Sequence, residues 1–228
     1  MSSIKPIKIW GQDGPNPPKV AMLVEELGLP HEIIPVSFGD VKKPEFLKIN
    51  PNGRMPAIYD PNTDLTLWES GAIIEYLIEK YDTDRKLSYA PGSNDAYHTK
   101  QWLYFQVSGQ GPYYGQAVWF KRNHPERVQS ALDRYLNEMK RVTSVLDGHL
   151  KKQKEKYGNE PWLVGDRITY ADLAFLTFQL FVPDILSEDL KPFDLDQFTE
   201  VSGWVARLKE RPAVKKVLEN MSKPTQKP

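Results

Sequence analysis

The order of apolar patterns in the first 82 residues limits this chain to few folds. Four short apolar runs have the composition of strands, at residues 7–10, 31–36, 57–60 and 65–68. Three segments have helical character, at residues 17–27, 44–50 and 69–81. The pattern therefore predicts an α/β unit in the order βαβαββα, in which the last two strands form a hairpin.

The chain changes character after this unit. Residues 83–93 have the composition of a linker, and residues 94–228 carry helical patterns. The clearest of these covers residues 128–149, where apolar side chains recur every three or four positions. We therefore expect an α/β domain at residues 1–82, a linker at 83–93 and an all-helical domain at 94–228.

Composition excludes several classes of function. The 228 residues include 30 basic and 30 acidic side chains, so no net charge attracts nucleic acid or an anionic membrane. No apolar run approaches the roughly 20 residues that a membrane span needs, and the N-terminal segment lacks the apolar core of a signal peptide. We expect a cytoplasmic protein whose partner is a small neutral or zwitterionic molecule.

Cysteine is absent, which excludes disulfides, thiolate metal ligands and a cysteine nucleophile belonging to the protein. Any sulfur chemistry must therefore use sulfur that arrives with a ligand. The four histidines lack the spacing that places two of them on one helical face beside a carboxylate, so we expect no metal site.

Asn16 stands directly before two prolines and the first predicted helix. One interpretation is structural, because asparagine is a favoured N-cap residue and proline is favoured at the first helical position. The other is functional, because the side chain also carries two N–H donors at a helix N-terminus, where an anion is stabilised. A thiolate is one such anion.

Two other stretches favour the binding of a peptide with charged ends. The Met55–Pro56 bond lies between a turn and a strand, where a cis proline is plausible and the Met55 backbone can pair with a bound peptide. Glu69 and Ser70 lie where a helix begins, so donors there suit a carboxylate and Glu69 suits an ammonium. Each stretch also has a structural interpretation, as a turn or a helix start.

Thr169 and Asp172 precede an apolar helix with the spacing of a capping box. In this interpretation the threonine hydroxyl accepts a hydrogen bond from a backbone N–H of the first turn. The Asp172 carboxylate accepts one from the Thr169 N–H. The alternative is a catalytic carboxylate at Asp172, and we take the pair as structural.

Five segments together resemble the cytosolic glutathione S-transferases: PNPPKV, NPNGRMPAI, LWESGAIIEYL, QWLYFQVSGQGPYYGQ and WLVGDRITYADLAF. The resemblance covers nearly the whole chain. The asparagine in PNPPKV and the QxxGxGPxxGQ segment are similar to the nu-class and the fungal nitrogen-regulator-like branch. The resemblance implies a thioredoxin-like N-terminal domain with a mixed sheet, an all-α C-terminal domain, glutathione as co-substrate and a homodimer.

The resemblance also implies residue roles. It implies that the γ-glutamyl head group of glutathione lies at Glu69 and Ser70, its cysteinyl backbone at Met55 beside cis Pro56, and its sulfur at the catalytic Asn16.

Two further positions bear on glutathione. Related sequences often have His or Gln where this chain has Val41, a side chain that helps to hold the glycine carboxylate, and Lys42 and Arg54 are the candidates to replace it. Some relatives hold two glutathione units with an arginine from the partner subunit, and Arg134 matches that position.

Aromatic residues are concentrated at residues 97–120, and GPYYGQ interrupts the helical pattern there. We expect this segment to line the acceptor pocket with Tyr113, Tyr114 and Trp119.

Three functions remain open. The first is thiol–disulfide chemistry, in which the glutathione thiolate held at Asn16 reduces a disulfide, a mixed glutathionyl disulfide or a peroxide. The second is conjugation of glutathione to an electrophile, and the third is a non-catalytic ligand-binding or regulatory role. The asparagine motif and the lack of protein cysteine favour the first.

Overall fold

A computed structural model of the chain describes residues 4–158, 160–185 and 197–221. It divides into two compact units, which are the described residues of Met1–Asp84 with Glu210–Pro228, and those of Arg85–Lys209. The expected helical domain ran from residue 94 to the end of the chain. In the structure the last described helix, α9 (Pro212–Met221), instead packs against α1 (Asn16–Glu26) of the first unit.

The first unit contains a four-stranded mixed sheet, which confirms the predicted thioredoxin-like arrangement. Its strands are β1 (Ile7–Trp10), β2 (His31–Ile34), β3 (Ala57–Asp60) and β4 (Leu65–Trp68), in the spatial order β2-β1-β3-β4. The β1–β2 pair is parallel, and the β1–β3 and β3–β4 pairs are antiparallel. Strand β2 ends two residues earlier than the sequence pattern predicts.

Helices α1, α2 (Pro44–Leu47) and α3 (Ser70–Tyr81) complete the predicted βαβαββα order. Helix α1 packs against β1, α3 and α9. The core of this unit consists of side chains with at most 1% of their surface exposed, including Ile7, Ile9, Val20, Leu23, Ile58, Ile73 and Leu77. This packing holds the N-termini of α1 and α3, where the predicted site residues lie.

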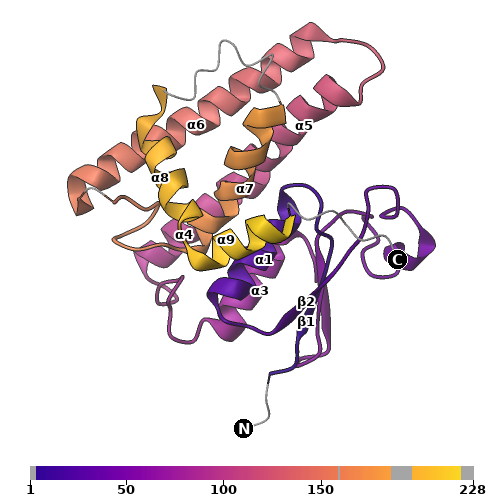
Figure 1. Cartoon of the computed structure of the whole chain (residues 1–228). Coiled ribbons are helices and arrows are strands. Elements are labelled where there is room, and N and C mark those ends of the chain that lie inside the picture. The colour runs from indigo at the N-terminus through magenta and orange to yellow at the C-terminus, as the bar shows by residue number, and fades with distance from the viewer. Residues whose placement is uncertain (1–3, 159, 186–196, 222–228) are drawn as a thin grey trace. The chain divides into compact units, whose positions relative to one another are not determined.

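The second unit is helical, as predicted. It contains α4 (Asn94–Phe105), the π-helical segment η1 (Gln106–Gln110), α5 (Gly111–Arg122), α6 (Gln129–Tyr157), α7 (Tyr170–Ile185) and α8 (Thr199–Lys209). Figure 1 shows α5 and α6 running side by side. Within the described ranges, no helix is long and apolar enough to cross a membrane.

One expectation about this unit is wrong, because GPYYGQ does not interrupt the helix. It forms the first turns of α5, directly after the π-helical η1. The backbone stays helical through Gln110 and Gly111, with φ and ψ of −57° and −55° and of −55° and −56°, so Pro112 follows η1 without a break. The extra residue per turn of η1 is therefore the real irregularity in this stretch.

Asp172 has the structural role predicted for it. Its Oδ2 accepts hydrogen bonds from the Thr169 backbone N–H and hydroxyl, both at 2.8 Å. Its Oδ1 accepts from the Leu163 backbone N–H and from Trp204 Nε1, both at 2.9 Å. The threonine hydroxyl thus donates to the carboxylate, where the sequence analysis expected it to accept from the backbone.

Candidate glutathione site

Asn16 is the first residue of α1 and is half-buried. Asn16 was expected to be the N-cap residue of this helix. That position is instead occupied by Pro15, which has φ and ψ of −83° and −14° in the helical region. Pro17 and Pro18 have no N–H, so the Lys19 N–H is the first that an Asn16 side chain could cap. In the described part of the chain, the Asn16 side chain has no hydrogen-bond partner.

Lys19, one helical turn after Asn16, is a charged residue that the sequence analysis missed. Only 1% of its surface is exposed, so the aliphatic chain and the amine both lie in the interior. Burial lowers the pKa of Lys19 to about 7, and the negative charge of Glu69 acts in the opposite direction. The available signal was its position three residues after Asn16, on the same face of the helix.

Asn50 organises the loop before the Met55–Pro56 bond. It is 2% exposed, and both ends of its amide are used within the loop. Nδ2 donates to the Arg54 carbonyl at 2.6 Å, and Oδ1 accepts from the Asn52 backbone N–H at 2.9 Å. Gly53 completes the turn with φ of +60°, where an added Cβ would lie 2.7 Å from the Val41 carbonyl oxygen.

The same loop lies between Lys42 and Glu69. Lys42 Nζ donates to the Asn52 carbonyl at 2.8 Å, and Asn52 Nδ2 donates to Glu69 Oε1 over a longer 3.5 Å. The Arg54 side chain is exposed, while Val41 is 8% exposed and belongs to the core. The structure therefore assembles Lys42, Arg54 and Glu69 around one loop.

The Met55–Pro56 peptide bond is cis, the state that its place between a turn and a strand made plausible. The Met55 side chain packs closely against Gly11, where an added Cβ would lie 2.7 Å from Met55 Cβ and Sδ. Gly11 has φ of +103°, which a residue with a side chain rarely adopts. This contact joins the loop of Met55 to the segment that leads into α1.

Glu69 has φ of 72° and ψ of 114°, an unusual conformation for a residue other than glycine. Such conformations cost free energy and persist only where the surrounding structure holds them. They are concentrated at functional sites. Glu69 is exposed and lies directly before α3, while Ser70 is buried as the first residue of that helix. An acidic side chain and a helix N-terminus are thus presented next to each other.

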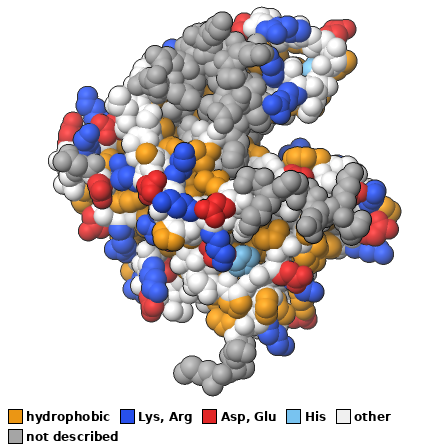
Figure 2. Space-filling model, viewed as in Figure 1, with side chains coloured by type: hydrophobic (Ala, Val, Ile, Leu, Met, Phe, Trp, Pro, Cys, Tyr) orange, Lys and Arg blue, Asp and Glu red, His pale blue; other side chains and the backbone are white. Residues whose placement is uncertain are grey.

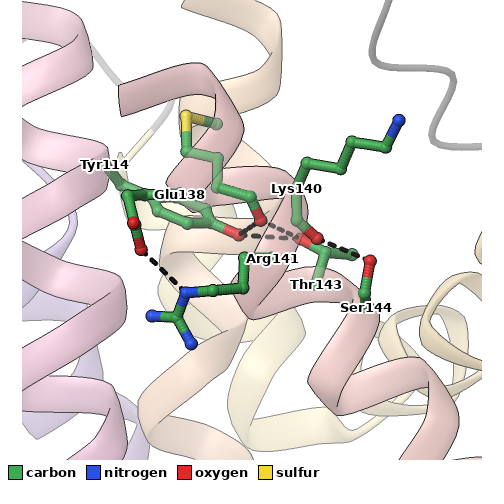
Figure 3. A network of polar contacts seen from close by, with 7 residues as sticks. Tyr114, Glu138, Lys140, Arg141, Thr143 and Ser144 are labelled. Atoms are coloured by element: carbon green, nitrogen blue, oxygen red, sulfur yellow. Dashed lines mark hydrogen bonds and ion pairs between the residues drawn. The ribbon is translucent and has the colours of Figure 1, made fainter. Parts of the chain in front are cut away.

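The predicted acceptor residues all belong to the second unit. Tyr113 is half-buried and packs against Tyr135, and Trp119 is 40% exposed beside Phe120. Tyr114 has no exposed surface, and Figure 3 shows its hydroxyl directed at Thr143 Oγ1, 2.9 Å away. Because a fully buried ring cannot meet an acceptor from solvent, we retain only Tyr113 and Trp119 as acceptor candidates.

Arg134 is exposed on α6. On the face shown in Figure 2, acidic and basic side chains are interspersed. No group of three or more His, Asp or Glu side chains suited to a metal ion occurs in the described ranges.

Comparison with known proteins identifies the family. Residues 5–79 match the glutathione S-transferase N-terminal domain, and residues 112–212 match the C-terminal domain. The chain belongs to the glutathione S-transferase family. A curated relative, the glutathione S-transferase-like protein gedE of Aspergillus terreus, is 55% identical over 98% of this chain and 99% of its own.

Solved structures of this transferase family agree over nearly the whole chain, and the neighbours are of the fungal Ure2p type. The transferase URE2P6 of Phanerochaete chrysosporium, solved with oxidised glutathione, has a TM-score of 0.86 and 47% identity, covering 96% of this chain and 97% of that one. Ure2p5 of the same organism, cocrystallised with 1-(S-glutathionyl)-2,4-dinitrobenzene, has a TM-score of 0.83 and 38% identity, covering 97% and 96%.

Proposed function

We propose that this transferase uses glutathione for thiol–disulfide chemistry and that Asn16 stabilises the glutathione thiolate. The observation that carries the proposal is the Asn16 side chain, whose amide lies at the N-terminus of α1 and makes no capping hydrogen bond, so its N–H donors are available to a ligand. Amide donors and a helix N-terminus both favour an anion over its protonated form. The complex of URE2P6 with oxidised glutathione, the product of such chemistry, supports this choice.

The reaction proceeds in two exchanges. The bound glutathione thiolate attacks one sulfur of a disulfide, a glutathionyl mixed disulfide forms, and the leaving thiolate takes up a proton. The thiolate of a second glutathione attacks the glutathionyl sulfur and releases the second thiol and oxidised glutathione. Two glutathione molecules are oxidised, and one disulfide is reduced by two electrons.

Glutathione is oriented in this proposal by the residues around the Asn50 loop. Glu69 accepts a hydrogen bond from the γ-glutamyl ammonium, and Ser70 with the N-terminus of α3 binds the adjacent carboxylate. The Met55 backbone beside Pro56 pairs with the cysteinyl residue. Lys42 and Arg54 supply positive charge for the glycine carboxylate in place of the polar residue absent at Val41.

The cytoplasmic location, the homodimer and the role of the partner subunit's Arg134 toward a second glutathione belong to the same proposal. They rest on the family resemblance.

A second function, conjugation of glutathione to an electrophile, is favoured by one observation. Ure2p5 was cocrystallised with a glutathione conjugate of dinitrobenzene. Conjugation needs the same thiolate at Asn16, with a carbon electrophile in place of the disulfide. The two functions therefore differ only in the acceptor.

Parallel assays of bis(2-hydroxyethyl) disulfide reduction and chlorodinitrobenzene conjugation distinguish the two functions. We expect glutathione-dependent disulfide turnover well above conjugation, and loss of most turnover in Asn16→Ala. Strong conjugation without disulfide turnover would make the protein a conjugating transferase. The absence of both activities would contradict an enzymatic role.

A further inference from the structure

Phe38 is a strongly exposed aromatic residue at the tip of a hydrogen-bonded turn. Its exposure is 67%, the largest of the exposed apolar side chains in the described ranges. The turn is closed by the Asp40 N–H, which donates to the Ser37 carbonyl at 3.0 Å, and by the Ser37 hydroxyl, which donates to Asp40 Oδ2 at 2.7 Å. Asp40 also forms a solvent-exposed ion pair with Lys43.

The Phe38 ring is also held against the segment that leads to Asn16. A Cβ added to Gly14 would lie 3.1 Å from Phe38 Cζ, so the ring edge is in contact with the Gly14 backbone. Gly14 has φ of +77° and precedes Asn16 by two residues. The glycine thus provides both the backbone turn and the space that the ring occupies.

Isolated exposed apolar side chains are common on protein surfaces and need no function. Phe38 differs because its turn is closed by hydrogen bonds and its ring edge, although exposed, lies against the Gly14 backbone. Gly14 lies two residues before Asn16, the residue assigned to the sulfur of glutathione, so the ring contacts the segment that leads to that residue. The tripeptide itself is polar and is matched by polar groups at Glu69, Ser70 and Lys42, so an apolar face there suits another molecule.

We propose that Phe38 is a specificity-determining residue that contacts the group bonded to the glutathione sulfur. The ring favours acceptors whose non-glutathione half is apolar, such as a mixed disulfide with an apolar thiol or an electrophile with an apolar body. This inference rests on the proposed function, since it takes the sulfur to lie at Asn16.

S-Substituted glutathiones test the inference without turnover. Dissociation constants are measured by calorimetry for glutathione, S-methylglutathione and S-hexylglutathione with the wild type and Phe38→Ala. We expect the wild type to bind the hexyl compound more tightly than the methyl compound. Phe38→Ala should reduce the ratio of the methyl to the hexyl dissociation constant about fivefold. This loss is expected when one aromatic face no longer covers a short alkyl chain.

Two control variants sharpen the result. Phe38→Leu keeps an apolar side chain and should retain most of the gain, while Tyr157→Ala removes a 41% exposed ring at the end of α6 and should retain all of it. An equal loss for all three ligands in Phe38→Ala, or no loss, would overturn the inference while the proposed function stands. A wild type that binds none of the three would overturn the proposed function and the inference together.

Discussion

At the scale of single residues, the site depends on side chains whose environment changes what their chemistry can do. Asn16 is an ordinary asparagine in sequence, but at the start of α1, where Pro17 and Pro18 offer no N–H, it makes no capping hydrogen bond. Lys19 is an ordinary lysine in sequence, but its burial lowers its pKa to about 7. Both effects act within the first turn of α1.

Asn16→Ala should raise the pKa of the bound glutathione thiol. An amide donor to a charged acceptor contributes about 1.5–3 kcal/mol, so a rise of about one to two units is expected. The pKa is measured from the ultraviolet absorbance of the thiolate in the enzyme–glutathione complex across pH. Asn16→Asp is a useful comparison, because its negative charge should raise the thiol pKa further. An unchanged titration in Asn16→Ala would remove Asn16 from this role.

Lys19 makes the stability of the free protein depend on pH in alkaline solution. Its pKa is about 7 in the folded protein and 10.5 when unperturbed, so between these values the unfolded chain binds a proton that the folded chain does not. Stability therefore rises with pH in this window, by at most about 1.4 kcal/mol per unit. Below pH 7 the full cost of the buried charge is present.

The matched variant is Lys19→Met, which keeps the volume and removes the titration. Urea unfolding at pH 7.5 and 9.5 should show the wild type gaining about 2 kcal/mol relative to Lys19→Met between the two values. A stability difference that does not change with pH would show that Lys19 keeps its ordinary pKa.

At the scale of elements, the structure confirms most of the predicted helices and strands and differs from the prediction at a few positions. The alternating apolar runs identified all four strands, and β3 and β4 have the predicted bounds. The glycines and proline of GPYYGQ were taken for a break, yet the chain stays helical from η1 into α5, with helical φ and ψ at Gln110 and Gly111. The role of Asn50 could not be predicted from the sequence. A single asparagine in a turn-rich stretch does not show that its amide N–H and its oxygen will both form hydrogen bonds within the loop.

Asn50→Ala should raise the KM for glutathione about tenfold or more, because the loop that carries Arg54 and Met55 loses its two side-chain hydrogen bonds. The accompanying loss of stability should be about 1–2 kcal/mol. Steady-state kinetics and urea unfolding measure the two quantities.

The control is Asn62→Ala in the β3–β4 turn, whose amide donates to the Lys5 carbonyl at 3.0 Å and to Asp60 Oδ1 at 2.8 Å. It should lower stability without changing KM. Equal KM values in the two variants would refute a positioning role for Asn50.

At the scale of the whole molecule, the first unit is assembled from both ends of the sequence. Arg211 donates two hydrogen bonds to the Glu26 carboxylate, at 2.6 and 2.7 Å, across 185 positions of the chain. Lys216 pairs with Glu25 at 2.7 Å on the same helix. These pairs fasten α9 to the C-terminal end of α1, opposite to the end that holds Asn16.

Arg211→Met should lower the free energy of unfolding by about 1–2 kcal/mol, because Glu26, which is 9% exposed, loses a bidentate partner in a partly solvated site. The double variant with Glu26→Gln should recover part of this loss. Lys215→Met is the control, since its pair with Glu210 is half-exposed or more on both sides and should contribute little. Equal effects of Arg211→Met and Lys215→Met in urea unfolding would contradict a fastening role.

The sequence by itself determined the fold class, the βαβαββα order, the family and the candidate glutathione residues, because periodicity, turn chemistry and short motifs are local properties of the chain. Only the tertiary structure showed α9 joining the first unit, Lys19 buried, Asn50 bridging its loop and Phe38 resting on Gly14. The α9 packing, the burial of Lys19 and the Phe38 contact depend on residues distant in sequence coming together, whereas the Asn50 hydrogen bonds are local and depend on how its loop closes. Burial and close approach are properties of the packed chain, so the tertiary structure decided them.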